Sequence, residues 1–329
     1  MKNLFYIFCI CISVSVIFSC KKEEINLQTN FTFNSTELVP DTLTPMVFNC
    51  GSDPIQLHIG GVYQYSNARF NPNNSNEIAY IRQKNNSNTE RNRLYTFNFE
   101  TGETRKLSDK EIRYFDWSIN DDISFITQER ELWVMKLNGS ELRKIEANDI
   151  SYVNKWNEDG TQLLIDSIPN SLFDKQYKKI IDINGQVLTR IDSLILNPFR
   201  YADWQGSNLL FNQFNSNHFY NLDRDETKII NIVTTPSIKD VKFSKNGSIT
   251  WIMHRMLKRK NLSTSEEELI KSYNNRISFS RLDISHDFRT ILLSGSLYTM
   301  TSDCSHQIEN LLFLLNSDGT LLRRILIPE

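Results

Sequence analysis

Six charged residues recur at one position of a repeated pattern, and they are the residues best placed to do chemistry. Each stands directly before an apolar or aromatic residue that opens a polar turn; in chain order they are Arg69, Asp116, Lys155, Asp203, Lys242 and Asp283. The residue before each charge is apolar except at Asn154, which is the alternation of a half-buried strand. Because the charges alternate in sign, strands gathered near one axis would let each charge pair with both neighbours. We expect either a self-satisfied ring of ion pairs or a channel-facing site for a small polar ligand or cation.

Motifs of hydrolytic enzymes and metal sites do not occur in this sequence. It contains no Gly-x-Ser-x-Gly and no His-Glu-x-x-His, so no catalytic residue is predicted. The histidines are scattered without a pair at metal-ligand spacing; they are His58, His218, His254, His286 and His306. Histidines from separate repeats could still converge on a metal. The sequence predicts no metal and no cofactor, and it favours a protein that is not an enzyme.

The elements that must position these residues form a repeat of an anchor, a polar turn and an apolar strand. The six anchors are Phe70, Trp117, Trp156, Trp204, Phe243 and Ile284. Five of the repeats also contain a strand, a tight turn such as Asn138-Gly139 or Asp318-Gly319, and a strand with a basic end. Anchor separations of 47, 39, 48, 39 and 41 residues are typical of four-stranded blades. The sequence predicts an all-β fold, a six-bladed β-propeller of four-stranded antiparallel blades, with the anchors packed between blades.

The fifth repeat has a different segment where the hairpin is expected. Residues 254–275 contain Ser263 and Ser265, each followed three residues later by glutamate, which is the pattern of a helix capping box. We therefore expect a helical insertion there, either as a surface element or as a loop with a function. The basic strand ends of the other repeats have two interpretations, a guard against edge-to-edge pairing and a polyanion site, and we favour the guard.

The repeats resemble the WD40-like units of TolB-type six-bladed propellers. Phe70-Asn71-Pro72, Asp159-Gly160 and the run Leu132–Gly139 carry the resemblance best, which covers roughly residues 68 to 326. It implies a propeller that binds a partner or helps to assemble the cell envelope. Only the first turn has the proline of the family pattern, and Ile284 replaces an aromatic anchor.

The N-terminus reads as a lipoprotein signal peptide over residues 1–19. Lys2 precedes an almost unbroken apolar run, and Ile17–Cys20 resembles the lipobox of bacterial lipoproteins, which implies lipidation of Cys20. An ordinary cleaved secretory signal is the alternative. Residues 21–24, Lys-Lys-Glu-Glu, resemble the surface-export tag of Bacteroidetes lipoproteins, although a charged spacer fits equally well. We expect an outer-membrane lipoprotein, on the periplasmic face or the cell surface, with a flexible tether over residues 20–49 and the propeller over 50–329.

Two cysteines remain after the signal and the lipidated residue, Cys50 and Cys304. They lie at opposite ends of the folded part and either form a disulfide or stay as free thiols. Residues 55–59 alternate in character and could complete the last blade from the other end of the chain, close to both cysteines.

Charge and length limit the functions that remain. With a net charge of -2 and a pI near 6.3, the protein lacks the long-range positive potential of a nucleic-acid binder, so no nucleic-acid partner is predicted. The favoured function is a membrane-tethered interaction propeller with a protein or glycan partner. The alternatives are a propeller enzyme of the polysaccharide-lyase or hydrolase kind and a TolB-like envelope assembly component.

Overall fold

The chain divides into two compact units, Met1–Thr32 and Phe33–Glu329. The computed structural model describes residues 36–39, 57–59, 61–145, 150–167, 177–191, 201–213, 216–224, 226–230, 238–253, 255–273, 276–300 and 306–328, all within the second unit. Cys20, Cys50, Cys304 and most of the predicted tether lie outside these ranges. Within them, no helix has the length and apolar character needed to cross a membrane.

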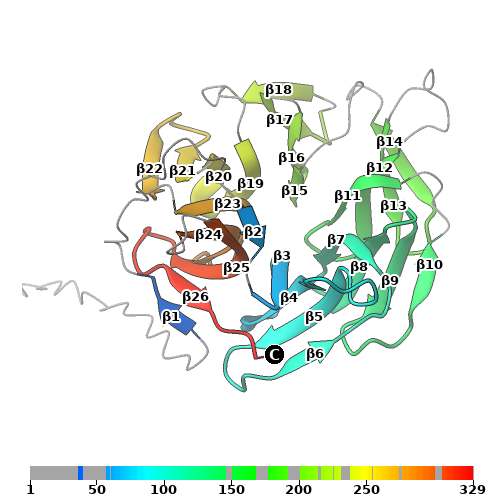
Figure 1. The fold of residues 1–329 in the computed structure, drawn as a ribbon. Coiled ribbons are helices and arrows are strands. Elements are labelled where there is room, and N and C mark those ends of the chain that lie inside the picture. Colours follow the sequence, from blue (N-terminus) through cyan, green and yellow to red (C-terminus); the bar gives the residue numbers. More distant parts are fainter. Residues whose placement is uncertain are drawn as a thin grey trace, which may run out of the picture. The chain divides into compact units, whose positions relative to one another are not determined.

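The second unit is all-β and consists of six antiparallel blades (Figure 1). Blade 1 is β3 (Tyr63–Asn71), β4 (Asn74–Lys84), β5 (Arg93–Asn98) and β6 (Thr104–Lys106); blade 2 is β7 (Ile112–Trp117), β8 (Asp122–Thr127), β9 (Leu132–Lys136) and β10 (Arg143–Ile145). Blade 3 is β11 (Ile150–Trp156), β12 (Gln162–Ser167), β13 (Tyr177–Asp182) and β14 (Val187–Ile191); blade 4 is β15 (Tyr201–Gln205), β16 (Asn208–Gln213), β17 (Ser216–Asn221) and β18 (Glu226–Ile230). Blade 5 is β19 (Ile238–Ser244), β20 (Ser248–Met253), β21 (Met256–Asn261) and β22 (Glu267–Ser272), with a short 3-10 turn at Lys245–Gly247; blade 6 is β23 (Ile277–Ile284), β24 (Thr290–Met300), β25 (His306–Asn316) and β26 (Arg323–Ile325).

The first strands of the blades form a closed ring. Each contacts the first strand of the next blade, and β23 of blade 6 contacts β3 of blade 1. The predicted six-bladed propeller of four-stranded blades is thus confirmed. Because each blade packs its faces against its two neighbours, the first strands surround the propeller axis.

The aromatic anchors pack between blades, as their recurrence predicts. Trp117 at the end of β7 is buried against Ile81 and Leu94 of blade 1. Trp156 of blade 3 is buried in the same way against Leu132 of blade 2. The sixth anchor, Ile284, is only half-buried. Each hydrophobic cluster therefore joins two blades, which stabilises the ring through its interfaces.

Tight hairpin turns connect the outer strands where glycine follows asparagine or aspartate. Gly139 and Gly319 both have a φ of +83°, a backbone conformation that side chains rarely adopt. At Gly319 a Cβ atom would lie 2.5 Å from the carbonyl oxygen of Ile270 in blade 5. This turn therefore requires glycine for its conformation and for the close approach of two blades.

The helical insertion predicted for residues 254–275 is wrong, because β21 and β22 form an ordinary antiparallel hairpin there. The Asn261 side chain accepts hydrogen bonds from the backbone N–H groups of Ser263 and Thr264, which fixes a turn instead of a helix start. The basic and acidic runs then face each other across the strands, with Lys258 paired to Glu267 at 2.8 Å. Blade 5 therefore has the same outer hairpin as the other blades, although its sequence pattern predicted a helix.

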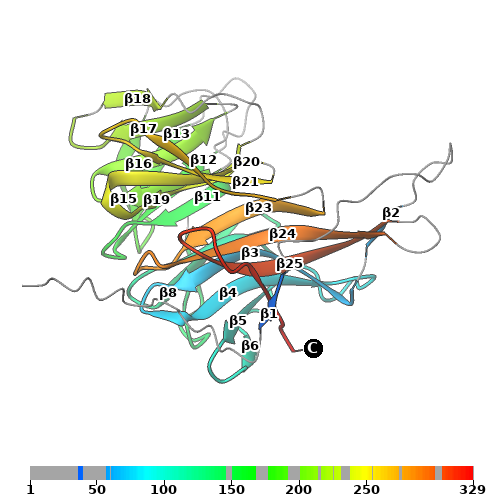
Figure 2. The ribbon, with the colours of Figure 1, turned by 90° about the vertical axis from the view of Figure 1, so that its left-hand side faces the viewer.

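The N-terminal part of the unit adds two strands to blade 6. β1 (Thr36–Leu38) pairs antiparallel with the outer strand β26, so these residues do not belong to a flexible tether, and the predicted boundary at residue 50 is wrong. β2 (Leu57–Ile59) joins the same sheet, as proposed for residues 55–59, but in parallel with the start of β25. Figure 2 shows β24 and β25 running together to β2. Blade 6 already has four strands, so β1 covers an exposed edge instead of completing the blade.

The basic ends of several strands hold neighbouring blades together. Arg105 of blade 1 donates to the carbonyl oxygen of Leu137 in blade 2 at 2.9 Å, and Arg143 of blade 2 donates to Ile183 in blade 3 at 2.8 Å. Arg259 of blade 5 likewise donates to a carbonyl of blade 6. These guanidinium groups are engaged within the protein, which favours the structural interpretation over a polyanion site.

Candidate functional site: an axial charged ring beneath a pocket

The six charged residues singled out in the sequence lie on the first strands of the six blades, one on each: β3, β7, β11, β15, β19 and β23. The structure brings them together around the axis, although they are up to 214 positions apart in the chain. Asp116 and Lys242 are only 2% and 3% exposed. Strand alternation turns these side chains away from the apolar contacts made by the anchors beside them.

Ion pairs link the six residues in the order of the blades. Arg69 lies 3.8 Å from Asp116, which lies 3.2 Å from Lys155. Lys155 is also 3.5 Å from Asp203, and Asp203 is 3.3 Å from Lys242. Lys242 reaches the last blade, where it lies 3.9 Å from Asp283. We call this set of six side chains the axial ring.

Each aspartate of the axial ring also binds the backbone of the next blade. One carboxylate oxygen of Asp116 accepts the N–H of Trp156 at 2.9 Å, and Asp203 accepts the N–H of Phe243 at 2.8 Å. Asp283 closes the ring by accepting the N–H of Phe70 at 2.9 Å. The aspartates therefore tie the anchor of one blade to the inner strand of the blade before it.

Asp240 on β19 has the same role, and the sequence analysis did not find it. It is 1% exposed and accepts the N–H of Leu282 in blade 6 at 3.0 Å. Its position, three residues before the anchor Phe243, falls outside the register in which the other charges recur. In the sequence, Asp240 could be noticed only as an aspartate that interrupts the pattern of a buried strand.

The pKa shifts of the charged side chains differ around the axial ring. Burial works to lower the pKa of Lys155, but Asp116 and Asp203 outweigh it, so this pKa is raised. Burial would raise the pKa of Asp203, and Lys242 with Lys155 outweighs it, so this pKa is lowered. In blades 5 and 6, burial and repulsion from Arg69 lower the pKa of Lys242, and burial raises the pKa of Asp283. The pKa shifts of Lys155 and Asp203 thus favour their charged forms, whereas those of Lys242 and Asp283 are in the direction of their neutral forms.

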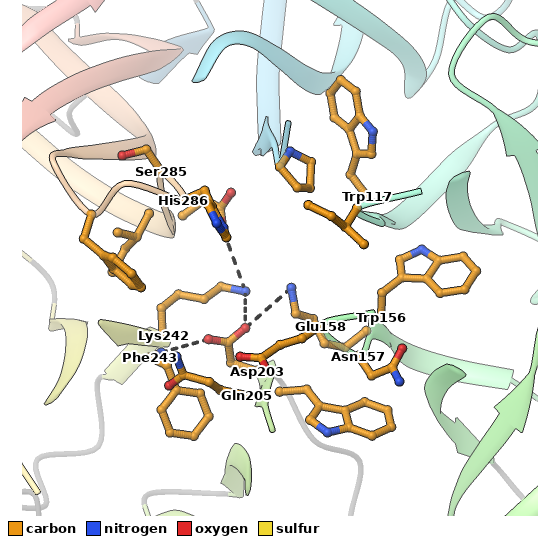
Figure 3. Close-up of a pocket in the computed structure, with 17 residues that line it drawn as sticks. Trp117, Trp156, Asn157, Glu158, Asp203, Gln205, Lys242, Phe243, Ser285 and His286 are labelled. Atoms are coloured by element: carbon orange, nitrogen blue, oxygen red, sulfur yellow. Dashed lines mark hydrogen bonds and ion pairs between the residues drawn. The ribbon is translucent and has the colours of Figure 1, made fainter. Parts of the chain in front are cut away.

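A pocket of about 530 Å³ opens above part of the axial ring (Figure 3). Charged ring residues and aromatic anchors form its inner part, and the turns between first and second strands form its rim. The lining includes Lys155, Asp203, Lys242, Asp283, Trp117, Trp156, Trp204 and Phe243, with Asn157, Glu158, Gln205 and His286 from the turns. Of the six residues predicted to face the channel, four line this pocket, and Arg69 and Asp116 do not.

The tryptophans at the pocket differ in their hydrogen bonding. Trp204 donates its indole N–H to the carbonyl oxygen of Gly206 at 2.7 Å. The indole nitrogens of Trp117 and Trp156 are buried and have no hydrogen-bond partner among the described residues. Packing between blades therefore fixes these two rings more than polar contacts do.

The described ranges contain no group of three His, Cys, Asp or Glu residues that could hold a metal ion. His286 stands at the pocket rim. His254 lies outside the described residues, and the other histidines lie on strands whose side chains are not described.

Comparison with known proteins supports the fold and goes no further. No protein-family model matches the chain, and no characterised protein matches it in sequence. Among solved structures, TolB from Acinetobacter baumannii is similar with a TM-score of 0.60 and 14% identity, covering 77% of this chain and 64% of TolB. An acylaminoacyl peptidase from Pyrococcus horikoshii has a TM-score of 0.54 at 14% identity, with 80% of this chain matching 52% of the enzyme.

A third structure matches over nearly its whole length. The β-propeller domain of the Trilobed protease from Pyrococcus furiosus has a TM-score of 0.52 and 16% identity, covering 80% of this chain and 98% of that domain. The chain spans less than two thirds of TolB and about half of the peptidase. At these identities the likeness shows that residues 33–329 have the β-propeller fold found in TolB and in the propeller domains of peptidases.

Proposed function

We propose that this protein is a binding propeller that engages a segment of a partner protein in the pocket above the axial ring. The observation that carries the proposal is the combination of a concave site at one end of the axis with aromatic side chains and charges fixed beneath it. Protein interfaces are enriched in aromatic anchors, and a preorganised polar floor limits the entropy lost on binding.

The charges of the floor support binding more than catalysis. Asp203 already accepts a backbone N–H and contacts two lysines, so its carboxylate is committed on both oxygens. A general base needs a carboxylate that can reach a substrate proton. Charges fixed in this way present a constant electrostatic potential, and a ligand with the complementary charge distribution would bind to it selectively.

An envelope location fits this proposal. Ile17–Cys20 resembles a lipobox, and two or three acyl chains on Cys20 would hold the protein durably on a bilayer. The fold likeness to TolB is compatible with a role in the cell envelope. Replacing Cys20 by Ala should move the protein from the membrane fraction to the soluble fraction, and unchanged fractionation would contradict the anchor.

The partner is tested by capture from envelope extracts with matched charge reversals. Glu158 is an exposed residue at the pocket rim, and Glu129 is an exposed residue in the turn between β8 and β9, at the other end of blade 2. We expect the parent and Glu129→Lys to enrich the same envelope protein and Glu158→Lys to lose it. Equal enrichment by both variants would show that the pocket does not bind the partner.

A further inference from the structure

A second cavity lies between blades 1 and 2 at the end opposite the axial pocket. Its volume is about 880 Å³, and it is lined by Gln83 near the end of β4, by the loop between β4 and β5, and by Glu111 and Gln128 of blade 2. The axial pocket is lined by turns between first and second strands, whereas this loop joins the second and third strands. In an antiparallel blade these connections are at opposite ends, so the two cavities are separate.

Carboxamide residues make up most of the lining of this cavity, and those of Asn85 and Asn88 already have hydrogen-bond partners. Gln83, Asn86, Asn92 and Gln128 each offer an amide, and Glu111 adds a carboxylate. None of these five side chains has a hydrogen bond or an ion pair with any residue that the structure describes. All but Asn86 are half-buried. Their hydrogen-bonding capacity is therefore available to a ligand.

The loop that carries some of these amides is held in place by its own contacts. The backbone N–H of Lys84 donates to Glu90 at 3.0 Å, and Ser87 accepts the N–H groups of Thr89 and Glu90. Arg91 donates to the Asn88 amide oxygen at 2.5 Å. The cavity wall is thus formed before a ligand arrives, which lowers the entropic cost of binding.

We propose that this cavity binds a neutral oligosaccharide. A carboxamide presents a donor and an acceptor in one plane, and a sugar hydroxyl both donates and accepts, so several amides match a ligand with adjacent hydroxyls. The two ionisable groups of the lining, Arg91 and Glu111, have opposite charges, which favours a neutral ligand over an acidic one. The site is independent of the protein-binding pocket proposed above.

Other ligand classes fit the lining less well. It has no aromatic residue on which a nucleic-acid base could stack, and Arg91 is its single cation. It also has no large apolar side chain of the kind that anchors a protein interface. The composition of the cavity is therefore that of a hydroxyl-binding site.

The test is calorimetric titration of the full chain with cellotriose, maltotriose, chitotriose and mannotriose, and with trigalacturonate as the acidic probe. We expect at least one neutral trisaccharide to bind and trigalacturonate to bind more weakly. Gln128→Ala and Gln83→Ala should each lower the affinity about three- to ten-fold, as expected for the loss of one or two hydrogen bonds. Gln186→Ala, an exposed amide on blade 3, is the matched control and should bind like the parent.

Three results would overturn the proposal. They are an absence of binding by every neutral trisaccharide, stronger binding of trigalacturonate, and unchanged affinity in both Gln128→Ala and Gln83→Ala. Thermal unfolding of each variant shows whether a loss of affinity reflects misfolding. The Glu158→Lys capture experiment uses a different cavity and a different partner, so either proposal can fail while the other holds.

Discussion

The aspartates of the axial ring are chemically alike but differ in the cations around them. Asp203 has lysines at 3.3 and 3.5 Å, whereas Asp283 has Lys242 at 3.9 Å and is influenced most by the charge of Arg69. Removing one partner of a buried ion pair costs about 3–5 kcal/mol, because the other charge is left uncompensated. We expect Asp203→Asn to lower the free energy of unfolding by about 3 kcal/mol or more.

Asp283→Asn is the matched comparison, and urea unfolding at pH 7 measures both variants. The asparagine oxygen can keep the bond from the Phe70 N–H, and burial raises the pKa of Asp283 despite the opposing effects of Arg69 and Lys242, so its charge is less well compensated than that of Asp203. We expect a smaller loss than for Asp203→Asn, about 1 kcal/mol, because an amide replaces the carboxylate that faces Lys242. Equal losses for the two variants would contradict the unequal electrostatics of the ring.

The contribution of Asp203 should depend on pH with a definite sign. Its pKa is lowered in the folded protein, so it binds its proton less tightly there than in the unfolded chain, where the pKa is about 3.9. The stability it supplies is therefore present above about pH 4 and is lost as the pH falls through the folded pKa. The stability difference between the parent and Asp203→Asn should be constant from pH 7 to 5 and should shrink below pH 4. A difference that grows on acidification would reverse this assignment.

At the scale of strands, most of the blades could be predicted because the sequence of each blade contains its own local pattern. The anchors and the Asn-Gly or Asp-Gly turns specify strands locally, and the anchor spacing specifies their number. β1 has no such signal, since three residues, Thr-Glu-Leu, show no period and pair with β26, which lies 287 residues further along the chain. The pairing of β2 with β25 had a signal in the alternation of residues 55–59, but its parallel direction had none.

The β21–β22 hairpin offers a test in which two structures predict opposite signs. Ser265 has a φ of +63°, which costs a residue other than glycine about 1 kcal/mol. Ser265→Gly should therefore raise the melting temperature by a few degrees. In the helix that the capping-box pattern predicts, the same change would be destabilising. A lower melting temperature, measured by circular dichroism, would contradict the hairpin.

For the site, the sequence could place the six charges in one register but could not show which of them reach a cavity. That depends on the depth of each side chain below the turns, which only the packed blades determine. The turn residues Glu158 and Gln205 were missed because polar turns are ordinary in every blade. The amides of the second cavity were missed for a related reason, since Gln83 and Gln128 are distant in sequence and meet only when blades 1 and 2 pack.

At the scale of the whole molecule, the chain ends meet in blade 6. Thr36 accepts a hydrogen bond from Arg323 at 2.6 Å, and Leu57 is the register partner of His306. Cys50 lies seven residues before Leu57, and Cys304 lies two residues before His306, although both cysteines are outside the described residues. Seven extended residues span at most about 25 Å, so this register leaves the two thiols within reach of each other.

We therefore expect a Cys50–Cys304 disulfide in protein folded under oxidising conditions. It would close a loop of about 250 residues, for which the chain-entropy model gives roughly 5 kcal/mol, with smaller gains where the unfolded chain keeps structure. Mass spectrometry of a non-reducing digest should find the linked peptides, and reduction should lower the melting temperature of the parent but not of Cys50→Ser. A chain that begins at residue 40 lacks β1 and keeps both cysteines, so it should be less stable than the parent and still respond to reduction. Free thiols at both positions in oxidised, folded protein would contradict the disulfide and leave non-covalent contacts, such as those of β1 and β2, to join the two ends.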